Sequence, residues 1–553
     1  MTLPDTVESY SKYAAAEFIQ TAVFVDDRIY ERQDNTTGDT KSVVAPKTRK
    51  KAIKSVEAED PIQEAEIGES DSLPDARDIV TSFAKKQIVC SLYQPKKTAK
   101  YSPESDIFPL CKAADVVILD WDLFGDGGER ASELAEGLVT QAVKDVPEQL
   151  RLILIYTQEA NLFDIANRLY EKITGSIGDS LVPRPEDGGL AFHTENSRVV
   201  VLGKPGRTRT QEQEAFVVDE SDLADAAISE FAKLASGLLH AASLLGLSEI
   251  RKNSRKILSK FHHDLDAGFL THLSLSLPEE DASSHVIPLL VSEIESVLED
   301  ALARPLVPKG LLADWCNNVW IPGEHLGNIF KKDGVDYRKV AKLLCTEGFK
   351  AARAEEDATP NPDAEKKKNK NTRKAAQIFL PSADSSANQR FSHLMSSRTF
   401  YGNKDKTLKL GSVVHQKDDD TYLLCIQPVC DSVRLKSDRV FVFVQMEKGG
   451  EGDGDDASHI VILSDDSVRE LVYKPKSYLC FTTTFSPDLA TQEVVAKPDD
   501  QGALFFENTD GKRFYWADQL RASHAQRAVE RFASDLSRVG LTEAEWLRRL
   551  AKD

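Results

Sequence analysis

Five apolar segments of strand length alternate with helical patterns in the first half of this 553-residue chain. Each segment is rich in valine, isoleucine or leucine with little alternation of polar residues, which is typical of strands buried on both faces. The five segments are 20–27, 87–93, 115–122, 150–157 and 197–205. Residues 73–86, 129–146 and 160–173 place apolar side chains three and four positions apart, as amphipathic helices do. The alternation predicts an α/β fold with a doubly wound, five-stranded parallel sheet.

Polar side chains end four of these five segments. Asp26 and Asp27 end the first, Asp120 the third and Thr157 the fourth, and Lys204 lies at the end of the fifth. Because the carboxyl ends of parallel strands meet at one edge of a sheet, these side chains are expected to converge. Three neighbouring carboxylates repel each other and favour a divalent cation, and Mg²⁺ takes few protein oxygens and bridges to phosphate. A metal-supported Asp120 can then attack a phosphoryl group, whose oxygens Lys204 and Thr157 would stabilise.

The sequence around these residues resembles the receiver domain of two-component response regulators. The matching contexts are FVDD, ILDWDLFGDGG, LIYTQEA and VVLGKP, and the resemblance extends over residues 15–245. It implies a flavodoxin-like fold and a protein that accepts a phosphoryl group from a histidine kinase or a phosphotransfer protein. Such a protein is a phosphoacceptor and not an enzyme, apart from self-dephosphorylation.

The resemblance also assigns a role to each matching residue. Asp120 is the predicted phosphoacceptor, assisted by Thr157 and Lys204. The predicted Mg²⁺ ligands are the carboxylates of Asp26, Asp27 and Asp120 and the main-chain carbonyl of Asp122.

Three features depart from the usual pattern of the family. The acidic pair lies further from Asp120 than is usual, and the excess is segment 31–71, which is polar and poor in aromatic residues, as long loops are. A second insertion is predicted at about 179–196. The family's aromatic residue near the start of the fifth strand is missing, and Val199 or Val200 stands nearest to its place.

One enzyme class competes for the same motif. The stretch ILDWDLFGD also resembles motif one of haloacid-dehalogenase phosphatases, with Asp120 as nucleophile and Asp122 as the following acid. Those phosphatases place their second acidic pair after the lysine, where Asp219 and Asp222 are the candidates. Receivers place the pair before the nucleophile, as FVDD does here, and we therefore favour the receiver.

The rest of the chain predicts further domains without a readable activity. The receiver domain is expected at 1–247 and to end in one long helix at 220–246. A helical domain at 248–353, a flexible linker at 354–376 and a β-rich α+β domain at 377–553 with a helical tail are expected to follow. An effector enzyme with an unrecognised catalytic site in the C-terminal half is the alternative to an output through protein contacts.

A histidine in the helical domain raises the question of a phosphorelay. His263–Asp264–Leu265 faintly resembles the phosphoacceptor box of histidine kinases. No glycine-rich ATP-binding segment accompanies it, and a His-Asp pair is more often part of a polar helix face. We therefore expect that His263 does not relay phosphate.

Composition and charge limit the partners of the chain. Its formal net charge of −19 argues against broad nucleic-acid binding, because phosphate contacts need a positive surface. No membrane-spanning apolar run and no signal-peptide pattern is present, and the seven cysteines are scattered as in proteins with reduced thiols. We expect a cytoplasmic protein that binds a partner protein or itself through the receiver and helical domains. Its architecture is similar to that of receiver proteins in Detocs-like bacterial anti-phage systems, which act as effector or phosphate buffer.

Overall fold

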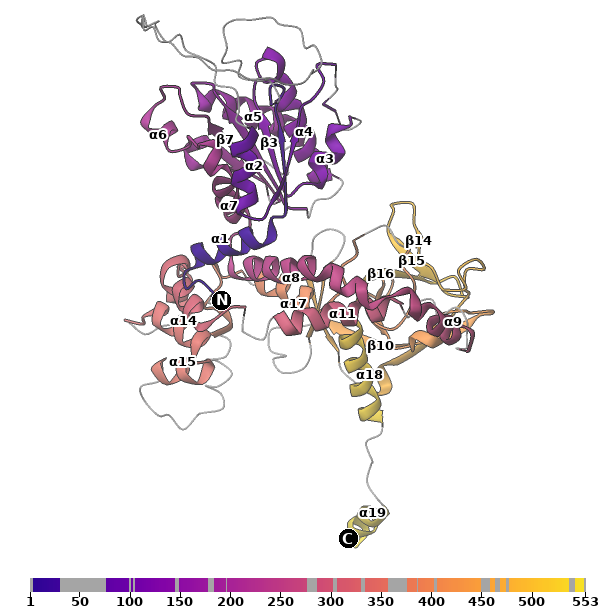
Figure 1. The fold of residues 1–553 in the computed structure, drawn as a ribbon. Coiled ribbons are helices and arrows are strands. Elements are labelled where there is room, and N and C mark those ends of the chain that lie inside the picture. Colours follow the sequence, from indigo (N-terminus) through magenta and orange to yellow (C-terminus); the bar gives the residue numbers. More distant parts are fainter. Residues whose placement is uncertain are drawn as a thin grey trace, which may run out of the picture. The chain divides into compact units, whose positions relative to one another are not determined.

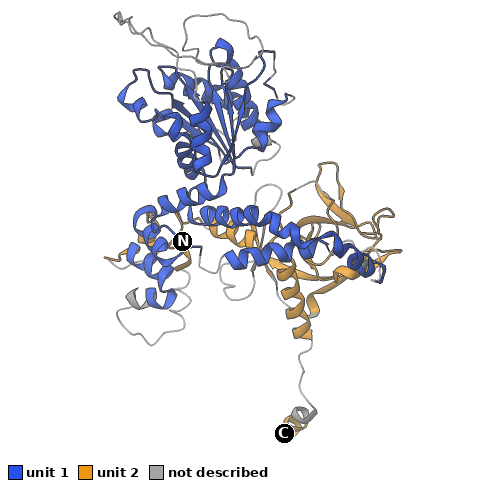
Figure 2. Ribbon diagram, in the orientation of Figure 1, with its two compact units in different colours: residues 1–320, 338–352 blue, residues 321–337, 353–553 orange. Residues whose placement is uncertain are grey.

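The structure is a computed structural model in which the chain forms two compact units (Figure 2). The first unit is Met1–Trp320 with Arg338–Ala352, and the second is Ile321–Tyr337 with Arg353–Asp553. The residues described are 3–29, 76–98, 101–102, 105–144, 149–177, 184–194, 196–275, 286–301, 306–329, 334–356, 375–384, 386–401, 405–448, 458–462, 468–473, 477–536 and 543–551. The insertion predicted at 31–71 and most of the linker predicted at 354–376 lie outside these residues. The domain boundaries drawn from the sequence stay predictions.

The N-terminal unit is built on a sheet with five parallel strands, as the sequence predicts (Figure 1). The strand order β2-β1-β3-β4-β7 is that of a flavodoxin-like doubly wound sheet. Val25 pairs with Leu119, and Thr157 with Gly203, so the ends of these strands are in register. The five strands are β1 (Thr21–Val25), β2 (Val89–Tyr93), β3 (Val116–Asp120), β4 (Arg151–Thr157) and β7 (Ser197–Gly203).

The second predicted insertion contains a hairpin that extends this sheet. Strands β5 (Arg184–Glu186) and β6 (Ala191–His193) are antiparallel, and β6 pairs with the outer edge of β7. The sheet is therefore mixed and has seven strands. The fully buried Arg198 of β7 forms ion pairs with Glu186 and Asp187 of the insertion and with Glu230. These pairs connect the hairpin to the helix that carries Glu230.

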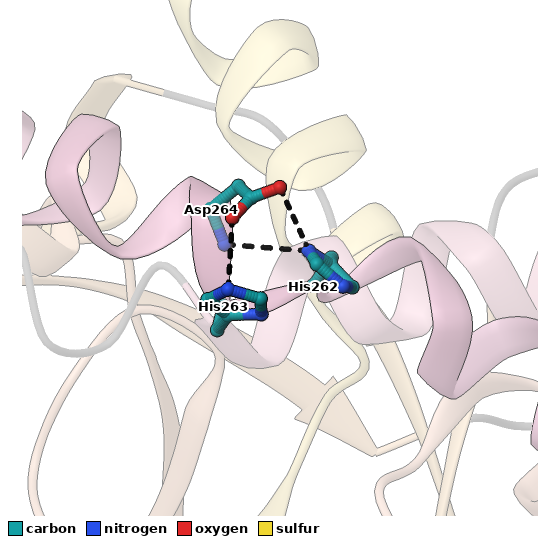
Figure 3. Close-up of side chains that lie close together, drawn as sticks. All are labelled: His262, His263 and Asp264. Carbon is teal, nitrogen blue, oxygen red and sulfur yellow. Dashed lines mark hydrogen bonds and ion pairs between the residues drawn. The ribbon is translucent and has the colours of Figure 1, made fainter.

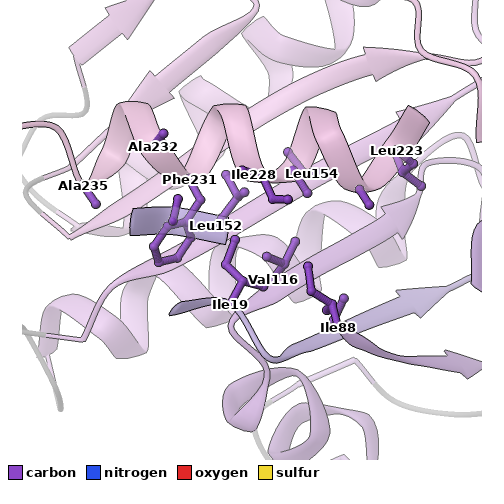
Figure 4. Packing of buried hydrophobic residues seen from close by; sticks show 14 of the residues in the cluster. Ile19, Ile88, Val116, Leu152, Leu154, Leu223, Ile228, Phe231, Ala232 and Ala235 are labelled. Atoms are coloured by element: carbon purple, nitrogen blue, oxygen red, sulfur yellow. The ribbon is translucent and has the colours of Figure 1, made fainter. Parts of the chain in front are cut away.

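Helices cover both faces of the sheet. On one face the buried residues come from α1 (Val7–Phe18), α2 (Ala76–Lys85) and α7 (Leu223–Leu234). On the other face they come from α3 (Ile107–Ala113), α4 (Glu129–Lys144) and α5 (Leu162–Ile177). Figure 4 shows Ile228 and Phe231 of α7 over Leu152 and Leu154 of β4. With both faces covered, the strands β3, β4 and β7 are buried throughout, which accounts for their lack of alternation.

The prediction of one long helix at 220–246 was wrong. Helix α7 ends at Leu234, and a separate helix, α8 (Leu238–Lys260), begins after Gly237. Gly237 has a φ of 116°, a conformation that glycine adopts without the penalty of a Cβ atom. Helix α8 is joined to the segments that precede β1 and β3 by Arg251, which donates to the Phe18 carbonyl at 2.9 Å and to Asp115 Oδ2 at 3.0 Å.

More helices follow α8, as the sequence predicts for the region after the sheet. Near the end of the predicted helical domain, the helices are interrupted at Gly348, whose φ is 86°. None of the described helices is long and apolar enough to cross a membrane. These helices are α9 (Asp266–Leu275), α11 (Val286–Ala301), α12 (Lys309–Asp314), α13 (Leu326–Ile329), α14 (Tyr337–Thr346) and α15 (Phe349–Glu356).

The C-terminal unit is β-rich with helices, as predicted. Its sheet is antiparallel, in the order β11-β12-β10-β9-β8-β16-β15-β14 with β13 paired to β10. One face packs against α18 (Ala522–Leu536), and the other has an aromatic core that includes Phe443 and Phe514. Helices α17 (Ser386–Ser396) and α19 (Glu543–Leu550) also belong to this unit. The strands are β8 (Ser412–Gln416), β9 (Thr421–Cys425), β10 (Arg439–Lys448), β11 (Ser458–Ile462), β12 (Val468–Tyr473), β13 (Cys480–Phe485), β14 (Lys497–Pro498), β15 (Leu504–Glu507) and β16 (Arg513–Gln519).

Candidate functional site

The six residues singled out from the sequence lie at one edge of the parallel sheet. A pocket of about 580 Å³ opens there, and its lining includes Asp27, Asp120, Asp122 and Thr157. The other two predicted residues, Asp26 and Lys204, are buried and are joined to Asp120 by the contacts described next. The topology therefore brings together side chains that are up to 178 positions apart in the sequence.

Lys204 connects the acidic residues of two strands. Its Nζ donates to Asp120 Oδ1 at 2.6 Å and lies 3.5 Å from Asp26 Oδ2. Burial alone would lower the pKa of Lys204, but the charges of Asp120 and Asp26 outweigh it and raise the pKa above its usual value. Lys204 is therefore a charged ammonium in contact with the carboxylate that the sequence predicts to be reactive.

Asp120 lies at the end of β3 and is almost fully buried. Its Oδ2 accepts a hydrogen bond from the main-chain N–H of Asp122 at 3.2 Å. Burial raises the pKa of Asp120, and the neighbouring charge of Asp26 adds to this, while Lys204 opposes it. The anionic form of Asp120 thus depends on nearby positive charge, of which Lys204 supplies one unit.

Asp27 carries an unsatisfied oxygen that bears on metal binding. Its Oδ2 accepts from the N–H of Phe124 at 3.0 Å, whereas its Oδ1 is buried and has no hydrogen-bond partner among the described residues. Burial raises the pKa of Asp27, and the nearby Asp120 raises it further. A buried carboxylate oxygen without a donor is costly, and a divalent cation would satisfy it. The residues therefore fit a Mg²⁺ ion at this position.

The loop after β3 is shaped by a tight packing of glycine on tryptophan. Gly128 has a φ of 91°, and a Cβ atom there would lie 2.0 Å from Trp121 Cε2. The guanidinium of Arg168 lies 5.2 Å from the Trp121 ring and donates to the Gly127 carbonyl at 2.9 Å. Asp122 Oδ1 accepts from the Gly127 N–H at 2.7 Å, so the Asp122 carboxylate is engaged within the loop. The predicted Mg²⁺ ligand at Asp122 is therefore the main-chain carbonyl and not this carboxylate.

The two loops that carry Thr157 and Lys204 are joined to each other. The N–H of Lys204 donates to the Thr157 carbonyl at 2.7 Å, and Thr157 Oγ1 accepts from the N–H of Glu159 at 3.1 Å. Arg209, which the sequence analysis did not single out, donates to carbonyls of both loops. The Thr157 hydroxyl is thus held at the pocket wall by its own loop.

Comparison with protein families supports the same assignment for the N-terminal part. Residues 18–209 match the family model of the response receiver domain. This part of the chain is therefore similar to receiver domains. No curated protein and no solved structure matched the chain. The receiver assignment supports a response-regulator-like signalling role and says nothing about the C-terminal half.

The phosphatase alternative finds no support in this receiver. Asp219 and Asp222, the candidates for the second acidic pair, are both exposed; Asp219 precedes the short turn Glu220–Asp222, and Asp222 is its last residue. Neither belongs to the described lining of the pocket that contains Asp120 and Asp122. The acidic pair that does reach Asp120 comes from the end of β1.

His263 lies in an exposed cluster with His262 and Asp264 (Figure 3). His263 Nε2 is 2.9 Å from Asp264 Oδ1, and His262 Nδ1 is 3.1 Å from Asp264 Oδ2. All three side chains are exposed, and they occupy a short turn between α8 and α9 and not the middle of a long helix. The structure therefore does not add to the faint resemblance to a kinase phosphoacceptor box.

Proposed function

We propose that the chain accepts a phosphoryl group on Asp120 in a Mg²⁺-dependent reaction and passes the signal on through protein contacts. The observation that carries the proposal is the pairing of Asp120 with the Lys204 ammonium at 2.6 Å, beside the unsatisfied Oδ1 of Asp27. This arrangement places a nucleophile and an unsatisfied carboxylate oxygen at the wall of one open pocket, with a buried cation in contact with the nucleophile.

The proposed ligands of Mg²⁺ are the carboxylates of Asp26, Asp27 and Asp120 and the main-chain carbonyl of Asp122. When bound, Mg²⁺ would neutralise the charge that builds up between the carboxylates and the phosphoryl oxygens. Asp26 already accepts the Arg28 N–H at 2.8 Å through Oδ1, which fixes the orientation of its carboxylate. These residues need no rearrangement of the sheet to act together, because the strand register sets their positions.

In the proposed reaction an Asp120 oxygen attacks phosphorus and forms the new O–P bond. The P–N bond of a phosphohistidine on the donor protein breaks, and the imidazole leaves and takes up a proton from water. The Lys204 ammonium faces one oxygen of the transferred group, and the Thr157 hydroxyl, which accepts from the Glu159 N–H, can donate its own proton to another. The donor class, a histidine kinase or a phosphotransfer protein, follows from the receiver domain.

The output is proposed to operate through protein contacts, with the receiver as a switch or a phosphate buffer. Helix α7 packs on the receiver sheet and leads into α8, which Arg251 holds against the carbonyl of Phe18. This continuity gives a structural change at the sheet a direct path to the helices that follow. A role in anti-phage defence is an expectation from the similarity of architecture to Detocs-like receiver proteins, and it stays a prediction.

A mass measurement tests the proposal. The full chain is incubated with acetyl phosphate and Mg²⁺, and its intact mass is recorded; we expect the gain of one phosphoryl group, and its loss when EDTA replaces Mg²⁺. Asp120→Asn, which keeps the side-chain shape, should abolish the gain. The exposed Asp164→Asn in the first turn of α5 is the control and should label like the unmodified chain. Equal labelling of Asp120→Asn would contradict the proposal.

A further inference from the structure

One arginine outside the predicted set binds the main chain of both loops at the pocket. The guanidinium of Arg209 donates through Nη1 to the carbonyl of Lys204 at 2.7 Å. Through Nη2 and Nε it donates to the carbonyl of Glu159 at 2.9 and 3.2 Å, and Nη2 also reaches the Thr157 carbonyl at 3.4 Å. Three carbonyls from two loops therefore share one side chain. We call this set of contacts the Arg209 clamp.

The geometry of the clamp requires arginine and a glycine beside it. A guanidinium is planar and has five N–H donors in a fixed fork, whereas a lysine ammonium has three donors on a single atom. Gly203 lies directly under the guanidinium, because a Cβ atom there would be 2.9 Å from Arg209 Cζ. The last residue of β7 must therefore be small for the fork to reach the Lys204 carbonyl.

We infer that Arg209 is a positioning residue that couples Thr157 to the segment after β7. The inference rests on the proposed function, since it concerns what happens when Thr157 moves. If the Thr157 hydroxyl moves towards a phosphoryl oxygen, the Glu159 N–H that donates to it at 3.1 Å must move with it or lose its acceptor. The Glu159 carbonyl is held by Arg209. The Thr157 loop therefore cannot shift without moving Arg209 or breaking its contacts.

Main-chain hydrogen bonds carry such a movement towards α7. Gly203 donates to the Phe216 carbonyl at 2.9 Å and accepts from the N–H of Val218 at 3.0 Å. The hydroxyl of Tyr156, the neighbour of Thr157, donates to the Val218 carbonyl at 2.7 Å. Residues 204–218 are thus fastened at both ends to the strands that carry Thr157 and Lys204, and α7 begins five residues later at Leu223. The Arg209 clamp thus gives a path for movement from Thr157 towards α7, and this path does not depend on an aromatic side chain at Val199 or Val200.

Hydrogen exchange on the full chain tests the clamp with and without beryllofluoride and Mg²⁺. Two variants disturb it differently: Arg209→Lys keeps the charge and loses the fork, and Gly203→Ala pushes the fork away. In the resting protein, both should increase exchange at 157–163 and 204–218 together, by about 5-fold or more. With beryllofluoride, the unmodified chain should respond in both segments, whereas the variants should respond at 157–163 only. Arg527→Lys, at an exposed position of α18, is the control and should behave like the unmodified chain.

Two results would overturn the inference. One is unchanged resting exchange of both segments in Arg209→Lys, and the other is a full beryllofluoride response at 204–218 in that variant. If the unmodified chain does not respond to beryllofluoride, the proposed function fails, and the resting exchange still decides whether the clamp joins the loops. If Gly203→Ala does not fold, Arg209→Lys decides alone.

Discussion

Asp27 Oδ1 is buried without a hydrogen-bond donor among the described residues, and this makes Asp27 the most informative residue for the metal. We predict that Mg²⁺ titration changes the fluorescence of Trp121, which follows Asp120 directly, and that Asp27→Asn weakens the response because it removes one ligand charge. The chain contains 5 tryptophans, so Trp121→Phe must abolish the signal for it to be assigned. Identical titrations of the unmodified chain and Asp27→Asn would count against the assigned ligands.

Gly128 supports the Asp120 loop by making room for Trp121. Gly128→Ala should lower the free energy of unfolding by about 3 kcal/mol, because it combines a left-handed conformation with a clash against the ring. Gly127→Ala is the matched control: its φ is also positive, at 65°, but nothing lies within 4 Å of the added Cβ, so about 1 kcal/mol is expected. Exchange of the β3 and β4 amides in urea measures both values, and equal losses would exclude the clash.

His263 is predicted to have no part in phosphoryl transfer. Its side chain is 78% exposed and its partner in the structure is the adjacent Asp264, so its loss should leave the receiver pocket unchanged. Labelling of His263→Ala with a phosphodonor, followed by intact-mass measurement, should match that of the unmodified chain. Loss of labelling in a folded His263→Ala protein would support a role of His263 in phosphoryl transfer.

At the scale of elements, the hairpin β5–β6 depends on charges that titrate in acid. Burial alone would raise the pKa of Asp187, but hydrogen bonds from Lys233 and the charge of Arg198 outweigh it and hold the pKa below its usual value. A carboxyl group of this kind stabilises the fold above its unfolded pKa of about 3.9, and the contribution is lost as the pH falls through the lower folded value.

Asp187→Asn tests this dependence on pH. Asparagine tolerates the positive φ of this position, 50°, so the substitution removes the charge with little backbone cost. The variant should melt at a lower temperature than the unmodified chain at neutral pH, and the difference should shrink in acid as the pH falls below about 3.9 and through the lower folded pKa. A difference that is the same at both pH values would show that Asp187 acts through packing and not through charge.

The elements that the sequence predicted well are those whose burial leaves a strong pattern. Strands such as β3 and β4 have apolar central residues because helices cover both faces of the sheet. The polar residues at their carboxyl ends mark the pocket. The hairpin was missed because three-residue strands are too short for a period to be seen. The break at Gly237 was missed because a glycine inside a helical pattern is often tolerated. Arg209 left no signal because its partners are main-chain carbonyls, which every residue has.

At the scale of the whole molecule, the receiver must reach the helices through α7 and α8. We predict that beryllofluoride with Mg²⁺ changes hydrogen exchange in α8 and in residues 248–355, or changes the oligomeric state measured by light scattering. The reason is that Arg251 of α8 binds both Asp115, next to β3, and the Phe18 carbonyl, next to β1. Asp120→Asn should show no change. If changes stay within the site loops, the receiver acts as a phosphate sink.

The hairpin on β7 also affects how the protein behaves at high concentration. A free sheet edge offers unpaired main-chain groups to other chains and promotes aggregation. Here β6 occupies the edge of β7, all seven residues of which are buried, and the sheet ends in the three-residue β5. The middle residue of β5 is Pro185, which has no N–H to donate to a further strand. The insertion thus protects the β7 edge of the sheet against edge-to-edge association, and a chain that lost it would expose an apolar strand prone to aggregate.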